Sequence, residues 1–142
     1  MNALAFLPLL LAATPVPGLP LDVLPKQDLP ATGCAAYLWA ATGADQRTLV
    51  AMAAAEPAHL RVSLDGAIVD LSRSAQRGAT NFGLSESTDY AAPGIRATLD
   101  LTIETRGDLV KGAAIPDGAL RIDRDGKDGV VVPVTGLVGC SG

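Results

Sequence analysis

Residues 59–72 read HLRVSLDGAIVDLS and predict a β-hairpin of definite register. At its centre, Asp65 and Gly66 are residue types that accept the positive φ angles of a two-residue type I′ turn. Counting outward from this turn gives three apolar pairs on one face of the sheet: Leu64 with Ala67, Val62 with Val69, and Leu60 with Leu71. On the opposite face Arg61 falls across from Asp70, where the two charges attract. Both faces agree on one register, so the segment indicates antiparallel β structure.

A second segment, IRATLDLTIET at residues 95–105, alternates apolar with polar side chains, which is the pattern of a half-buried strand. Turns are expected at residues 115–120 (IPDGAL) and 124–129 (RDGKDG). In all, about eight short strands are expected, at residues 37–42, 48–55, 59–64, 67–72, 95–105, 109–115, 119–122 and 130–138. The pattern predicts an all-β fold, a single small antiparallel β-barrel or β-sandwich.

The length and charge of the chain narrow the classes of function. At 142 residues it is long enough for one domain and too short for two of ordinary size. Its formal net charge is −4, and its Lys and Arg residues form no cluster. Binding to nucleic acid needs a basic surface that neutralises phosphates, so we expect no nucleic-acid partner.

The N-terminus predicts export. Residues 3–13 form an apolar run of the length found in signal peptides, too short to span a bilayer stably. We interpret residues 1–13 as a signal peptide whose cleavage leaves no transmembrane segment. Because no Lys or Arg precedes the apolar run, a mis-assigned start or an uncleaved anchor stays open as an alternative.

Residues 14–33 form a linker whose prolines stand too close together for a helix or a central strand. The linker runs into LPATGC at residues 29–34, which matches the LPxTG motif of sortase substrates and loosely resembles a lipobox. A sortase motif lies near a C-terminus, and a lipobox cysteine follows directly on the apolar run, so neither fits this position. We interpret LPATGC as the start of the folded domain.

Cys34 and Cys140 are the only cysteines, and they stand at the two ends of the predicted domain, residues 34–142. An even cysteine count in an exported chain predicts a disulfide and a periplasmic or secreted location. In the chain-entropy treatment, closing a loop of this length stabilises the fold by about 4–5 kcal/mol. Two buried free thiols in a cytosolic protein are the alternative.

Catalytic and metal-binding patterns are weak. His59 is the only histidine, expected to be a solvated surface residue, and no serine lies in a GxSxG elbow. The stretch DRDGKDG at residues 123–129 begins like an EF-hand loop, but Lys127 takes the fifth position and Val134 the twelfth. The two cysteines lie too far apart to form a metal site with this histidine. We expect no catalytic residues, no metal and no other cofactor.

Residues 72–94 read SRSAQRGATNFGLSESTDYAAPG and predict a long connection without clear periodicity, which is often functional. Because Arg and aromatic residues are enriched at binding anchors, Arg73, Arg77, Phe82 and Tyr90 are the candidate binding residues. In the alternative interpretation, Phe82 and Tyr90 pin the loop to the sheet while the charges stay in solvent.

These observations favour a non-catalytic protein of the cell envelope that binds a protein or a small ligand through residues 72–94. A structural or assembly module that adds a strand to a partner is the second hypothesis, of a different class. A hydrolase is the least favoured class, and it stays open only because paired carboxylates cannot be recognised in the sequence.

Overall fold

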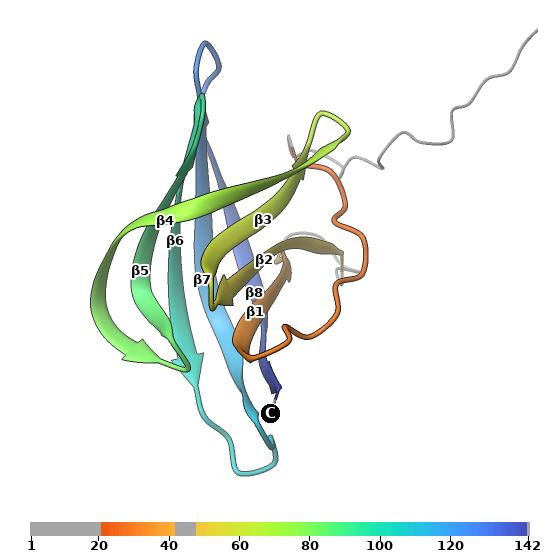
Figure 1. Ribbon diagram of the computed structural model, residues 1–142, viewed down its shortest axis with the longest axis vertical. Coiled ribbons are helices and arrows are strands. Elements are labelled where there is room, and N and C mark those ends of the chain that lie inside the picture. The colour runs from red at the N-terminus through yellow and green to blue at the C-terminus, as the bar shows by residue number, and fades with distance from the viewer. Residues whose placement is uncertain (1–20, 42–47, 142) are drawn as a thin grey trace, which may run out of the picture.

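The computed structural model describes residues 21–41 and 48–141, which form a closed barrel of eight antiparallel strands (Figure 1). Each strand pairs with its neighbours in sequence, and the last pairs with the first. The strands are β1 (Gly33–Ala40), β2 (Leu49–Ala55), β3 (Ala58–Leu64), β4 (Ala67–Asn81), β5 (Leu84–Ala92), β6 (Ile95–Glu104), β7 (Gly112–Arg124) and β8 (Val130–Ser141). The predicted all-β fold is confirmed, and a barrel is the form it takes. The predicted signal peptide and the first part of the predicted linker lie outside the described residues.

The β3–β4 hairpin has the predicted register in every pair, from Leu64 opposite Ala67 to Leu60 opposite Leu71. Asp65 and Gly66 form the turn with φ angles of 51° and 82°. Across the outer face, the guanidinium of Arg61 donates two hydrogen bonds to the carboxylate of Asp70, at 2.7 and 2.9 Å. The turn residues and the side-chain pattern therefore specify this hairpin together.

The prediction of a long loop at residues 72–94 is wrong. Strand β4 continues to Asn81, and after a two-residue turn at Phe82 and Gly83 the chain returns as β5. Two irregularities in the β4–β5 register shift the side-chain phase, one between Arg73 and Ala75 and one between Arg77 and Thr80. They erase the period-2 pattern, because side chains on either side of a bulge no longer alternate in step.

The predicted turn at residues 115–120 is also wrong. Strand β7 runs through this segment, and its register against β8 shifts between Ile115 and Gly118. Pro116 and Asp117 are exposed within this irregularity. Proline is compatible with a bulge because its missing N–H breaks no regular ladder bond there. The number of strands still agrees with the prediction. The strands expected at residues 109–115 and 119–122 are one strand, β7, and the segment expected to be a loop, residues 72–94, contains the additional strand β5.

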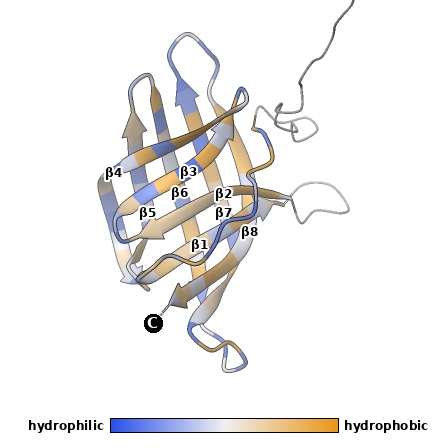
Figure 2. Ribbon diagram, turned by 45° about the vertical axis from the view of Figure 1, so that its right-hand side comes forward, coloured by the Kyte–Doolittle hydropathy of each residue, from blue (hydrophilic) through white to orange (hydrophobic). Residues whose placement is uncertain are grey.

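The barrel interior is filled by aliphatic side chains, which alternate with polar ones along the strands, as the bands in Figure 2 show. Its largest fully buried side chains are Leu21, Leu38, Val50, Leu60, Val62, Leu71, Leu99, Ile115, Leu120, Val132 and Val134. An eight-stranded barrel is narrow enough for side chains to fill it, so this interior is a packed core.

Residues 21–32, which we call the strap, belong to the predicted linker but pack against the barrel (Figure 1). Leu21 lies in the barrel core, and Leu24 lies in a second apolar cluster with Met52 of β2. The Asp22 carboxylate accepts a hydrogen bond of 2.8 Å from the N–H of Gly66. The strap is extended, as its prolines predict, but its leucines fix it to the barrel.

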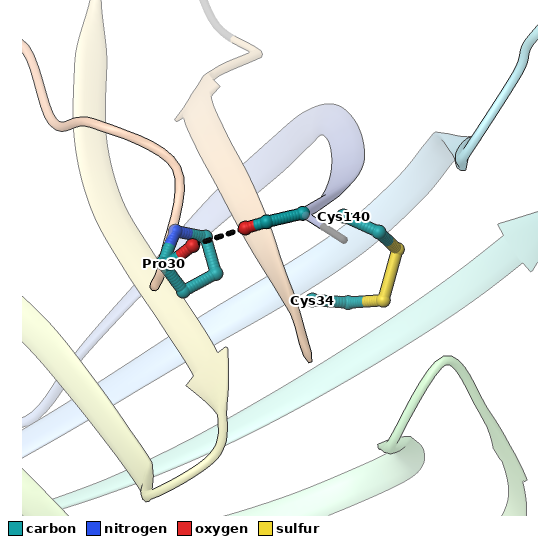
Figure 3. The surroundings of a disulfide bond; sticks show 4 residues. Pro30, Cys34 and Cys140 are labelled. Carbon is teal, nitrogen blue, oxygen red and sulfur yellow. Dashed lines mark hydrogen bonds between the residues drawn. A yellow bond between two sulfur atoms is a disulfide. The ribbon is translucent and has the colours of Figure 1, made fainter. Parts of the chain in front are cut away.

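The predicted disulfide is present. Cys34 of β1 and Cys140 of β8 stand directly opposite each other, with an S–S distance of 2.04 Å (Figure 3). Next to it, the hydroxyl of Ser141 donates a hydrogen bond to the Pro30 carbonyl of the strap. The bridge thus joins the first and last strands where their pairing closes the barrel.

Candidate functional site

Arg77 lies on the outer face of the β4–β5 hairpin in a polar network. Its guanidinium donates to both carboxylate oxygens of Asp89, at 3.0 and 2.9 Å, and to the Ser87 hydroxyl at 3.0 Å. The Thr98 hydroxyl of β6 also donates to Asp89, at 2.9 Å. The hydrogen bonds from Arg77 and Thr98 lower the pKa of Asp89, and the same pairing raises the pKa of Arg77. The charge of Arg77 is therefore already balanced within the hairpin.

Arg73 and Tyr90 are brought together as opposite residues of β4 and β5. Tyr90 is only 3% exposed and belongs to the barrel core, and burial raises the pKa of its phenol. Arg73 is exposed and donates a hydrogen bond of 3.0 Å to the Gln76 side-chain oxygen. Of these two candidate binding residues, only Arg73 presents its side chain to solvent.

Phe82 occupies the β4–β5 turn with a φ angle of 57° and packs, half-buried, against the core. The four candidates therefore do not form one patch. Arg77 lies on the outer face, Arg73 and Tyr90 share a pair on the other face, and Phe82 lies at the tip. This arrangement agrees with the alternative in which the two aromatic side chains anchor the segment while the arginines stay in solvent.

Strand β4 has an edge that no described strand pairs with, and the sequence did not reveal it. Its pairing with β3 ends at Ser72, which stands opposite His59, whereas its pairing with β5 continues to Asn81. Among the described residues, the stretch Arg73–Asn81 therefore has a strand on one side only. Figure 1 shows β4 leaving β3 and curving down beside β5. All residues from Ser72 to Asn81 are exposed, so in the described part of the chain this edge is open to solvent.

The alternation of backbone hydrogen bonds identifies the groups on this edge. Residues that flank a two-residue turn form a hydrogen-bonded pair, so Ala92 bonds to Ile95 of β6. Successive residues of an antiparallel strand direct their N–H and C=O groups to opposite sides. Because Ala92 bonds to β6, the residues of β5 that lie an odd number of positions before it, among them Asp89 and Ser87, bond to β4. Their partners on β4 are Ala75 and Arg77, and the residue between them, Gln76, directs its N–H and C=O away from β5. We call the backbone of residues 73–77 the β4 edge.

His59 is half-buried, not the solvated residue expected from the sequence. Its Nδ1 donates to the Pro57 carbonyl at 2.8 Å, and its Nε2 is buried without a hydrogen-bond partner among the residues that the structure describes. It forms no hydrogen bond with a serine or a carboxylate of the described chain. Within residues 21–41 and 48–141, no group of three or more His, Cys, Asp or Glu side chains could hold a metal ion.

The comparisons with known proteins assign no family. No family model, no curated protein and no solved structure matches this chain. In the described part of the chain, no helix is long and apolar enough to cross a membrane. The geometry of the barrel is therefore the basis for an inference about function.

Proposed function

We propose that this protein is a non-catalytic, exported binding module that captures an extended segment of a partner protein by strand addition at the β4 edge. The observation that carries the proposal is the stretch Arg73–Asn81, which contains the β4 edge, is exposed throughout and pairs on one side only within residues 21–41 and 48–141. The predicted signal peptide and the Cys34–Cys140 bridge support an oxidising compartment outside the cytosol.

Strand addition suits this edge because its backbone groups are already held in position. Since β5 fixes β4 in an extended conformation, the ordering cost falls mainly on the partner. The two bulges and the exposed arginines limit indiscriminate pairing, because natural edge strands use such features against aggregation. A partner strand would pair with β4 beyond Ser72, on the side that β3 leaves open because β3 begins only at Ala58.

The partner can be identified by photo-crosslinking in the native envelope fraction. A photoreactive residue at Ser74, an exposed position within the β4 edge, should yield a specific crosslinked protein. The same residue at Val131, an exposed position of β8 on the opposite side of the barrel, serves as the control. Equal crosslinking of one protein from both positions would argue against a defined contact at the β4 edge.

Binding of the identified partner then tests strand addition itself. Gln76→Pro removes the backbone N–H that faces the partner, at a position where the β4–β5 ladder does not use it. Gln76→Ala removes the same side chain and its hydrogen bonds but keeps the N–H. We expect the proline variant to fold and lose binding, and the alanine variant to bind normally. Equal affinity of a folded proline variant would refute strand addition at this edge.

A further inference from the structure

A small pocket of about 240 Å³ opens at the end of the barrel where β5 begins and β6 ends, and we call it the mouth pocket. It is lined by Ala79, Asn81, Leu84, Glu86, Leu101, Thr102 and Ile103. Its volume lies below the range of about 300–1,000 Å³ typical of drug-sized ligands, so it suits a smaller molecule. The mouths of β-barrels are among the places where ligand sites preferentially occur.

Glu86 gives the mouth pocket a negative charge that the rest of the described chain leaves uncompensated. Its carboxylate forms no ion pair and no hydrogen bond with any described residue. On the same strand, Asp89 is instead bound by Arg77 and Thr98. The amide of Asn81, also in the pocket, likewise has no hydrogen bond within the described residues. Both side chains are exposed at the rim of the pocket, where solvent rather than a described residue meets their polar atoms, so a ligand can bind them without breaking a contact within the described chain.

The backbone of β4 makes room for this carboxylate. Gly78 has a φ angle of +84°, and a Cβ atom there would lie 2.6 Å from Oε1 of Glu86 and 2.9 Å from its Cβ. Gly78 falls within the second irregularity of the β4–β5 register. Bulges at barrel rims commonly redirect side chains, and here the absence of a side chain lets Glu86 lie against β4.

We propose that the mouth pocket binds a small organic cation, a primary ammonium group carried on a short aliphatic chain. The ammonium would donate to the Glu86 carboxylate and to the Asn81 amide oxygen, since it carries three donors and no acceptor. The aliphatic chain would contact Leu84, Leu101 and Ile103. This inference rests on different atoms from strand addition at the β4 edge and goes beyond it.

The test uses n-butylammonium, with neutral 1-butanol and anionic butanoate as probes of matched size. Titration of the ¹⁵N-labelled protein should shift the backbone resonances of Leu84, Glu86 and Leu101 with n-butylammonium only. Glu86→Gln, which keeps the shape and removes the charge, should weaken this binding at least about tenfold. Gly78→Ala should weaken it as well, because the added methyl group displaces the carboxylate.

Glu104→Gln is the matched control, because it removes a carboxylate near the same end of β6 that is already paired with Arg106. This variant should bind n-butylammonium as the unaltered protein does. The proposal is overturned if n-butylammonium shifts no pocket resonances, if 1-butanol binds equally well, or if Glu86→Gln retains the affinity while its spectrum shows an intact fold.

Discussion

Cys34 and Cys140 face each other across β1 and β8, with their Cα atoms 4.0 Å apart and 106 positions apart in sequence. These strands are the first and the last of the barrel, so the covalent bridge lies at the seam that closes the sheet. The residues between the two cysteines comprise nearly the whole barrel.

Removal of this bridge should destabilise the barrel strongly. A Cys34→Ala/Cys140→Ala variant should lose up to about 4–5 kcal/mol of unfolding free energy, because the denatured chain regains the freedom of a loop of this length. Urea denaturation of the variant and of the oxidised protein measures the difference. Coincident midpoints with equal slopes would show that the bridge contributes nothing to stability.

Export and oxidation can be checked together by the intact mass of the protein from the envelope fraction. If the signal peptide is cleaved after Ala13, the mass corresponds to a chain that begins at Thr14. Both cysteines should react with an alkylating reagent only after reduction. A full-length chain with two free thiols would contradict the proposed compartment.

Replacement of glycine should destabilise the turn between β4 and β5 more than the turn between β3 and β4. Gly83 and Gly66 both have positive φ angles, 77° and 82°, so alanine costs about 1–2 kcal/mol at either position. At Gly83 an added Cβ would also lie 2.8 Å from the Cβ of Ala55, whereas at Gly66 it meets open space. Thermal or urea unfolding should therefore show a larger loss for Gly83→Ala. Equal losses would mean that the β4–β5 turn does not pack against β2 as described.

The Arg61–Asp70 pair should make a small, pH-dependent contribution to stability. The hydrogen bond from Arg61 lowers the pKa of Asp70 in the folded protein, so the carboxylate form is favoured by folding. The stabilisation by this pair is fully present at pH values above the pKa that Asp70 has in the unfolded chain. It is lost as the pH falls through the lowered pKa that Asp70 has in the folded protein. Both side chains are partly exposed, so about 0.2–1 kcal/mol is expected near neutral pH.

Urea midpoints of Asp70→Asn and of the unaltered protein, measured from neutral to acidic pH, test this expectation. The two should differ near neutrality and converge in acid. Asp117→Asn removes an exposed carboxylate that has no ion pair in the described chain and should leave the midpoint unchanged near neutrality. A difference that persists unchanged in acid would show that Asp70 stabilises the barrel by some means other than its charge.

Local sequence patterns predicted those parts of the fold in which backbone and side chains repeat regularly. Asp65-Gly66 specifies its turn, and the flanking alternation specifies the register, so the β3–β4 hairpin could be derived completely. Beyond Ser72 the two irregularities put polar residues out of phase and leave no buried face, so the same reasoning found a loop where a hairpin exists.

The long-range features could not be predicted in the same way. The cysteine count suggested the bridge, but the choice between barrel and sandwich depends on the pairing of β1 with β8, which no local pattern encodes. The same limit applies to the candidate site. Arg and aromatic residues in the sequence led to residues 72–94 as the candidate segment, whereas the β4 edge and the approach of Gly78 to Glu86 arise only from the folded backbone.

The central claim, that β4 offers a free edge for a partner strand, can be tested most directly by residue-specific amide hydrogen exchange in the protein alone. The N–H groups of Ala75 and Arg77 should exchange slowly, because they bond to β5, and the N–H of Gln76 between them should exchange rapidly. This alternation is the result that an unpaired edge requires. Protection of Gln76 equal to that of its two neighbours would show that the edge is already occupied and would contradict strand addition.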